Sequence, residues 1–297
     1  MKFAAIDLGS NAVRLLLAKV EEESVHPVYE KVSLFRMPIR LGEDAFPHKR
    51  ISEEKIQQLV KTMIGFKYLM DAFEPADYMA CATSAMRESE NSREIVDLIH
   101  KESGIDLSII SGKREAEIIY TNHVERIAGN NGRGCHLYVD VGGGSTEIIV
   151  FDEYKIMESR SFDIGSIRIH EGLVTKRDWE DMKLWVKHVS SRYQPISAVG
   201  SGGNINFLYS MSKTKDGEPF EYDKLKKLNS HIRSFTIEQR ISELNIRPDR
   251  ADLIVPAAKI YLSVMKWSGI TDMFVPQMGL ADGIIHVLYN KHKQTFV

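Results

Sequence analysis

Three turns rich in glycine, serine, threonine and asparagine carry the side chains best suited to chemistry. They lie at residues 7–11, 140–146 and 200–204, each after a short apolar run. Glycine lets backbone N–H groups approach an anion closely, and hydroxyl and amide groups add further donors. An aspartate that opens such a turn can hold a divalent cation, in the case of magnesium usually through water. Together the turns indicate phosphate binding assisted by a metal, although a single turn of this kind more often only reverses the chain.

Two of these turns belong to an internal repeat. Residues 3–18 read FAAIDLGSNAVRLLLA and residues 137–151 read LYVDVGGGSTEIIVF, so that Asp7 aligns with Asp140 and Gly9 with Gly142. Each copy is an apolar run, an aspartate, a turn of small residues and a second apolar run, which predicts a β-hairpin. Two such hairpins one domain length apart predict two related halves, unless the short match arose by chance.

The composition limits the classes of protein to consider. Of the 297 residues, 39 are lysine or arginine and 41 are aspartate or glutamate, which excludes a basic nucleic-acid coat and an acidic disordered tail. The two cysteines have no CxxC spacing, so neither a disulfide framework nor a zinc ribbon is expected. No segment resembles a signal peptide or a membrane span. We expect a cytoplasmic protein of about two domains that binds neither nucleic acid nor membrane.

Strand and helix patterns alternate along the chain, which predicts an α/β fold. Ser52 is the expected N-cap of a helix whose apolar face holds Ile56, Leu59, Val60, Met63 and Met70. Further strands are expected at 77–82, 105–110 and 196–199. The expected helices lie at 55–73, 92–101, 114–127, 178–191, 205–211, 222–235, 237–244 and 250–266.

The order of the short motifs resembles the exopolyphosphatase/guanosine pentaphosphate phosphatase (Ppx/GppA) family, within the superfamily of actin, hexokinase and the sugar kinases. The combination of DVGGGSTE with SGKREA is the most specific part of the resemblance. The matching segments are DLGSN at 7–11, ATSAMR at 82–87 with Asn91, SGKREA at 111–116, DVGGGSTE at 140–147, GSIRI at 165–169, GSGG at 200–203 and RAD at 250–252.

This resemblance implies two ribonuclease H-like (actin-like ATPase) domains with an interdomain cleft. The expected domains are 1–124 and 125–297, and the last helix can pack back on the first lobe. The implied reaction is release of terminal orthophosphate from inorganic polyphosphate, with guanosine pentaphosphate as the alternative substrate. Glu115 matches the catalytic base, and Asp140 and Glu147 match acidic positions near a magnesium ion. The resemblance implies phosphate contacts at Asn11, Arg87, Gly143, Gly144 and Ser145, to which the turn chemistry adds Ser10, Thr83, Ser84 and Gly202.

Simpler structural roles compete with each of these assignments. Glu115 also suits the dipole of the helix that it begins. Arg87 could pair with Glu88 or Glu90 on the surface. Asp7 and Asp140 could simply close Asx turns, with no ligand involved. Thr83 and Ser84 could cap the following helix.

Two further functions stay open. A non-catalytic alarmone or nucleotide binder is disfavoured by the intact carboxylates, and a sugar kinase or chaperone ATPase by the missing adenosine-binding loop.

Residues 279–283 read GLADG where the family often has GLREG, which puts any ligand contact there in doubt. Longer relatives add a helical HD-like region and a C-terminal domain. Their absence would favour shorter polyphosphates, weaker processivity or a homodimer.

Overall fold

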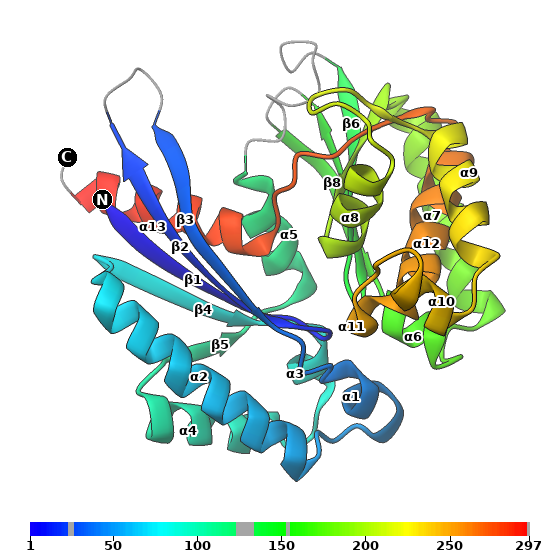
Figure 1. Ribbon diagram of the computed structural model, residues 1–297. Helices are drawn as coiled ribbons and strands as arrows, with labels where there is room; N and C mark the ends of the chain where they lie inside the picture. Colours follow the sequence, from blue (N-terminus) through cyan, green and yellow to red (C-terminus); the bar gives the residue numbers. More distant parts are fainter. Residues whose placement is uncertain (23–26, 123–133, 153–154, 296–297) are drawn as a thin grey trace. The chain divides into compact units, whose positions relative to one another are not determined.

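Each half of the chain builds one mixed β-sheet with helices packed against it (Figure 1). The structure is a computed structural model that describes residues 1–22, 27–122, 134–152 and 155–295. Met1–Asn122 and Leu280–Val297 form the first unit, and His123–Gly279 form the second. The expected boundary between residues 124 and 125 lies outside the described residues.

The sheet of the first unit has the strand order β3-β2-β1-β4-β5. Strands β1 (Lys2–Leu8), β2 (Val13–Glu21) and β3 (Val28–Met37) form an antiparallel meander. Strand β4 (Asp77–Ala82) runs parallel to β1, and β5 (Leu107–Ile109) runs parallel to β4. Helices α2 (Glu53–Phe73) and α4 (Ser92–Ser103) pack against each other, and the expected apolar face of α2 is buried.

The sheet of the second unit repeats this order and adds one strand, giving β10-β11-β9-β6-β7-β8. Strands β6 (Cys135–Val141), β7 (Thr146–Asp152) and β8 (Lys155–Phe162) form the meander, and β9 (Ser197–Ser201) and β11 (Asp272–Phe274) continue it in parallel. Strand β10 (Phe220–Glu221) is the short antiparallel edge. The predicted α/β class with two ribonuclease H-like, actin-like halves is confirmed by this repeated order.

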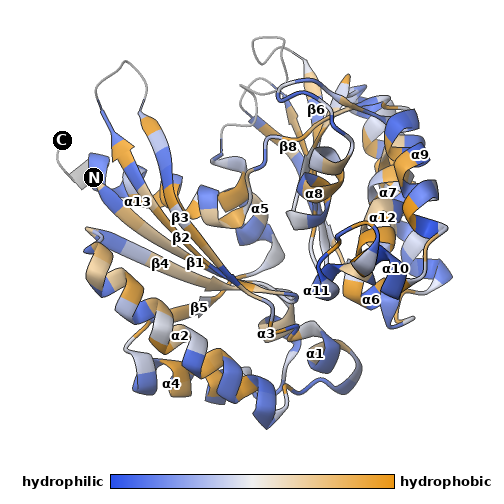
Figure 2. Ribbon diagram, in the orientation of Figure 1, coloured by the Kyte–Doolittle hydropathy of each residue, from blue (hydrophilic) through white to orange (hydrophobic). Residues whose placement is uncertain are grey.

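The helices of the second unit surround an apolar core that includes the inward faces of β6 and β7. Hydrophobic residues concentrate on α12 (Ile254–Ser268) and on the strands of both sheets (Figure 2). No helix in the described part of the chain has the length and apolar character that a membrane crossing requires. The other helices of this unit are α6 (Ser166–His170), α7 (Lys176–Tyr193), α8 (Gly203–Met211), α9 (Tyr222–Arg233), α10 (Ile237–Ser242) and α11 (Pro248–Ala251).

Two helix predictions were wrong in extent. The expected helix at 250–266 is broken into α11 and α12, because Pro256 has no N–H and is tolerated only in the first turn of a helix. The expected helix at 114–127 is α5 (Gly112–Tyr120), followed by a turn at Thr121 and Asn122. The Thr121 hydroxyl donates to the carbonyl of Ile118, which offers the backbone an alternative to a further helical turn. Residues 123–127 of that prediction lie outside the described residues.

The last helix, α13 (Leu280–Thr295), packs against β1, β2 and α5 in the first unit. Its Gly283 is a close-contact position, because an added Cβ would lie 2.2 Å from the Ile118 carbonyl oxygen. Asp282, in the GLADG segment, forms a 2.6 Å ion pair with Lys31 of β3. The segment that departs from the family motif therefore helps to dock α13 on its own unit.

Candidate functional site

In the first unit, the candidate phosphate-binding residues lie where β1 and β4 end side by side. The turn after β1 carries Ser10, whose hydroxyl lies 2.8 Å from that of Ser84, the residue at which α3 begins after β4. The Thr83 amide also donates to the Leu8 carbonyl. The hydroxyl-bearing residues Ser10, Thr83 and Ser84 are buried. The fold thus joins four of the predicted phosphate-binding residues, Ser10, Asn11, Thr83 and Ser84, through two neighbouring parallel strands.

Glu115 and Arg87 meet beside these turns. Glu115 lies in the first turn of α5 with only 8% of its surface exposed. The Arg87 guanidinium comes from α3 (Ser84–Glu88), lies 3.6 Å from the Glu115 carboxylate and donates to the Ile110 carbonyl at 2.7 Å. A carboxylate beside a guanidinium in a buried setting has the chemistry of a base next to a phosphate-binding group.

The competing structural roles fare differently. Ser111 caps α5 by accepting from the Arg114 amide, and Glu115 lies in the first turn of that helix, where its charge also suits the helix dipole. Glu88 pairs with Lys49 at 3.1 Å, and Arg87 contacts Glu115 instead. Thr83 occupies the N-cap position of α3, but its side chain makes no capping hydrogen bond.

In the second unit, the candidate metal-binding residues are two carboxylates. Asp140 of β6 and Glu147 of β7 are directly opposite each other in the antiparallel register. Glu147 is buried and accepts a 2.8 Å hydrogen bond from Ser161 of β8. Gly202, at φ 109°, lies so close that an added Cβ would be 3.1 Å from the Asp140 carboxylate and 2.8 Å from the Val141 carbonyl oxygen. The third turn therefore needs glycine in order to lie against Asp140.

The turn at residues 142–145 is held by α6. The amides of Ser166 and Ile167 donate to the carbonyls of Gly142 and Gly143 at 3.0 and 2.9 Å. The buried Arg168 donates from Nε to the Gly144 carbonyl at 2.7 Å. Three successive carbonyls are thereby engaged on the α6 side of the turn.

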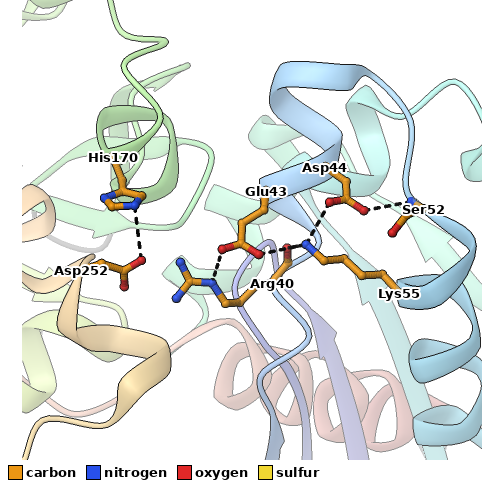
Figure 3. A network of polar contacts seen from close by, with 7 residues as sticks. All are labelled: Arg40, Glu43, Asp44, Ser52, Lys55, His170 and Asp252. Carbon is orange, nitrogen blue, oxygen red and sulfur yellow. Dashed lines mark hydrogen bonds and ion pairs between the residues drawn. The ribbon is translucent and has the colours of Figure 1, made fainter. Parts of the chain in front are cut away.

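These hydrogen bonds from α6 to the turn carbonyls fix the orientation of the peptide planes in the turn. The turn contains the predicted phosphate contacts Gly143, Gly144 and Ser145. Gly165 permits the approach of α6, because an added Cβ there would lie 2.3 Å from the Gly143 carbonyl oxygen. At the other end of α6, His170 lies 3.6 Å from Asp252 of the RAD motif (Figure 3). The GSIRI segment at 165–169 was identified as one of the segments that resemble the family. The sequence did not indicate that Arg168 holds the turn at residues 142–145.

The two hairpins differ in charge at the same register position. In the first unit Asp7 is opposite Arg14 and accepts a 2.7 Å charge-assisted hydrogen bond from it. In the second unit Asp140 is opposite Glu147. Like charges directly opposite each other are destabilising in a sheet, so a cation between them would be stabilising. No group of three or more His, Cys, Asp or Glu side chains suited to a metal occurs among the described residues. Asp140 and Glu147 offer carboxylate oxygens, the ligand type that magnesium prefers.

The two cysteines are unsuited to nucleophilic chemistry. Burial and the nearby Asp7 carboxylate raise the pKa of the Cys81 thiol to about 12, and burial with Asp152 raises that of Cys135 to about 11. Both thiols are therefore protonated near neutral pH. Cys81 faces Asp7 across β1 and β4, and we regard it as a packing residue.

Known proteins share this arrangement of strands and motifs. Residues 18–292 match the Ppx/GppA phosphatase family. The chain belongs to this family. A putative exopolyphosphatase from Haemophilus influenzae is 24% identical over 304 residues, which cover 97% of this chain and 91% of that protein.

Two further comparisons concern a longer relative and a solved structure. A bifunctional 3-dehydroquinate synthase/phosphatase from Fusobacterium nucleatum is 26% identical over 288 residues, covering 90% of this chain. The chain spans 43% of the length of that longer protein. The crystal structure of an exopolyphosphatase from Cytophaga hutchinsonii superposes with a TM-score of 0.84 at 22% identity and covers 98% of both chains, which establishes the fold.

Proposed function

We propose that this chain is an exopolyphosphatase, which releases terminal orthophosphate from inorganic polyphosphate. The observation that carries the proposal is the buried Glu115 carboxylate, 3.6 Å from the guanidinium of Arg87, whose amide donates to the Thr83 carbonyl at 2.9 Å. Membership of a phosphatase family and a relative named as a putative exopolyphosphatase support the same substrate class.

The reaction adds water across one P–O–P bridge. Glu115 orients the water and accepts its proton, a new bond forms between the water oxygen and the terminal phosphorus, and the bridging P–O bond breaks. The attacked phosphorus leaves as orthophosphate, and the chain, shorter by one unit, keeps the former bridging oxygen on its new terminal phosphate. Arg87 holds the equatorial oxygens of the terminal phosphate through its planar fork of donors. Phosphoryl transfer depends mainly on such positioning and on neutralised charge.

The turns supply the remaining phosphate contacts. Ser10, Asn11, Thr83 and Ser84 offer hydroxyl and amide donors from the first unit. Gly143, Gly144, Ser145 and Gly202 offer backbone N–H groups from the second unit. Arg168 keeps the first three of these in place through the Gly144 carbonyl. Backbone donors fixed in this way lose little entropy when phosphate binds.

Asp140 and Glu147 are the residues that would hold a magnesium ion. Their opposed carboxylates provide only oxygen ligands and carry two negative charges in close register. Magnesium prefers such ligands and keeps several waters. When bound, it neutralises charge on the phosphate oxygens. Glu147 is pre-oriented for this role by the hydrogen bond from Ser161.

Phosphate release from three substrates tests the proposal. Tripolyphosphate, long-chain polyphosphate and guanosine pentaphosphate are each incubated with the protein and magnesium, and orthophosphate is measured over time. We expect release from the polyphosphates, with the long chains shortened from their ends in gel analysis. Release from guanosine pentaphosphate alone would establish the alternative substrate. Release from none of the three would refute the proposed class of activity.

A further inference from the structure

Tyr261 of α12 is a fully buried tyrosine whose hydroxyl lies at the third glycine-rich turn, residues 200–204. The hydroxyl donates to the carbonyl of Ser201, the last residue of β9. Ser201 is paired with Asp140 in the parallel register of β6 and β9. The Tyr261 side chain therefore reaches the end of the strand that lies beside a candidate metal-binding carboxylate.

Three oxygen atoms lie close around Gly202, the residue that follows. A Cβ added to Gly202 would lie 2.8 Å from the Val141 carbonyl oxygen and 3.1 Å from a carboxylate oxygen of Asp140. The hydroxyl oxygen of Tyr261 would lie 3.2 Å from the same point. Asp140 is thus in the immediate surroundings of the hydroxyl, and the turn at Gly202 has little room to move between them.

The Tyr261 hydroxyl is suited to holding the turn and not to proton transfer. Burial, and next the charge of Asp140, raise the pKa of this hydroxyl well above 10. The group is therefore a neutral donor near neutral pH, and its proton is directed at the Ser201 carbonyl. Its contribution to the turn is a fixed hydrogen bond from the core of the second unit.

A second side-chain hydrogen bond holds the same residue. The Ser201 hydroxyl donates to the carbonyl of Met278 at 2.9 Å, and Ser201 has no exposed surface. The pairing of β9 with β11 ends at Val199, two residues before Ser201. The hydrogen bonds of Ser201 to Tyr261 and Met278 therefore hold the chain at a point where the pairing with β11 has already ended.

Helix α12 connects this contact with the rest of the second unit. It packs against β6, which carries Asp140, and against α6, which holds the turn at residues 142–145. Most of its inward face is buried in the core. The hydroxyl of Tyr261 therefore comes from a rigid element, which fixes the position of the hydrogen bond that it makes.

We propose that Tyr261 is a positioning residue for the Asp140 carboxylate: its hydroxyl holds the backbone at Ser201 and Gly202 against that carboxylate and so sets the oxygen position offered to magnesium. This inference rests on the proposed function, because it needs the magnesium-binding role proposed there for Asp140 and Glu147. Groups that hold a metal ligand in place from behind typically change metal affinity about 10- to 100-fold when they are removed.

The competing interpretation is that the hydroxyl only satisfies a buried carbonyl and stabilises the fold. Tyr261→Phe removes the hydroxyl and keeps the ring. Tyr209→Phe is the matched control, because Tyr209 is also buried in the second unit, and its hydroxyl lies 2.6 and 2.8 Å from the carbonyl oxygens of Lys215 and Glu218. A purely structural role predicts that both variants lose thermal stability and that both bind magnesium as the wild type does.

The experiment is isothermal titration of the full chain with magnesium chloride, with thermal melts and the magnesium dependence of phosphate release from tripolyphosphate measured beside it. We expect Tyr261→Phe to weaken magnesium binding about 10-fold or more and to raise the magnesium concentration for half-maximal release by a similar factor. Tyr209→Phe should leave both unchanged. If Tyr261→Phe does not fold, Gly202→Ala displaces the same backbone from Asp140 without altering Tyr261, and it should weaken magnesium binding to a similar extent.

The outcomes separate this inference from the proposed function. If folded Tyr261→Phe, or Gly202→Ala in its place, binds magnesium as the wild type does, the positioning role is wrong and the proposed function stands. If the wild type binds magnesium but releases no phosphate from any of the three substrates, the proposed function fails, and the titration of Tyr261→Phe still decides the positioning role. If the wild type binds no magnesium, the inference fails whatever the activity.

Discussion

Replacement of Glu115 by glutamine is the sharpest test of the chemistry. The change keeps the size and hydrogen-bonding capacity of the side chain but removes its ability to accept a proton. Loss of a general base reduces the rate about 10²- to 10⁴-fold, which corresponds to roughly 2.7–5.5 kcal/mol of transition-state stabilisation. The effect on folding should be much smaller. The Arg87 guanidinium is 3.6 Å from Glu115, remains partly exposed and keeps its bond to the Ile110 carbonyl. Loss of such a contact costs about 0.5–1 kcal/mol.

The assay compares kcat for polyphosphate hydrolysis with the thermal unfolding midpoint. Glu115→Gln should lose at least about 100-fold in kcat while its midpoint moves by roughly 2–4 °C and tripolyphosphate affinity changes little. Glu117→Gln is the matched control, since it makes the same chemical change on the same helix at an exposed ion pair with Arg114. A Glu115→Gln variant that retained more than about a third of the wild-type kcat, far above the loss expected of a missing base, would refute the assignment.

Three further predictions follow from the packing and the charges. Asp140→Asn should raise the magnesium concentration needed for half-maximal phosphate release, whereas Asp7→Asn, which changes a carboxylate already paired with Arg14, should leave this concentration unchanged. Gly283→Ala should destabilise the first unit by about 1–3 kcal/mol, because the added Cβ would lie 2.2 Å from the Ile118 carbonyl oxygen. Gly65→Ala, which has open space around it, should stabilise α2 by up to about 1 kcal/mol. Thermal melts of both variants test these expectations. Burial opposes ionisation of Asp77, but hydrogen bonds from Lys291, His292 and Tyr78 outweigh it and lower its pKa below 3.8. The stability that Asp77 provides is therefore complete above that pH and is lost as the pH falls below it, so melts of wild type and Asp77→Asn should converge in acid.

Local patterns predicted the elements that carry the turns. The two hairpins were predicted because each has apolar runs on both sides of a short turn, and the buried face of α2 was predicted from its helical periodicity. The alignment of Asp7 with Asp140 also predicted which residues occupy equivalent positions in the two sheets. These features depend on neighbouring residues along the chain, which is why sequence alone was informative.

Contacts between distant residues were not predictable in this way. Strands β3 and β8 mix charged and apolar residues at sheet edges, so neither showed a clear alternating pattern. Arg168 holds a carbonyl 24 residues earlier in the chain. Tyr261 donates to the Ser201 carbonyl, 60 residues earlier in the chain, and only the folded chain brings the two together. Side chains that position a site from another element leave no spacing that a sequence can reveal.

The repeated hairpin shows how one scaffold can serve two purposes. Both copies place an aspartate at the end of the first strand and a partner opposite it on the second strand. Where the partner is Arg14, the charge of Asp7 is satisfied within the protein. Where the partner is Glu147, two carboxylates lie opposite each other, an arrangement that a bound cation would stabilise. Under the proposed function, a difference at one register position separates a carboxylate paired with arginine from a pair of carboxylates that would hold a metal. The repeat predicts where the two turns lie, and the residue opposite each aspartate sets the charge at that turn.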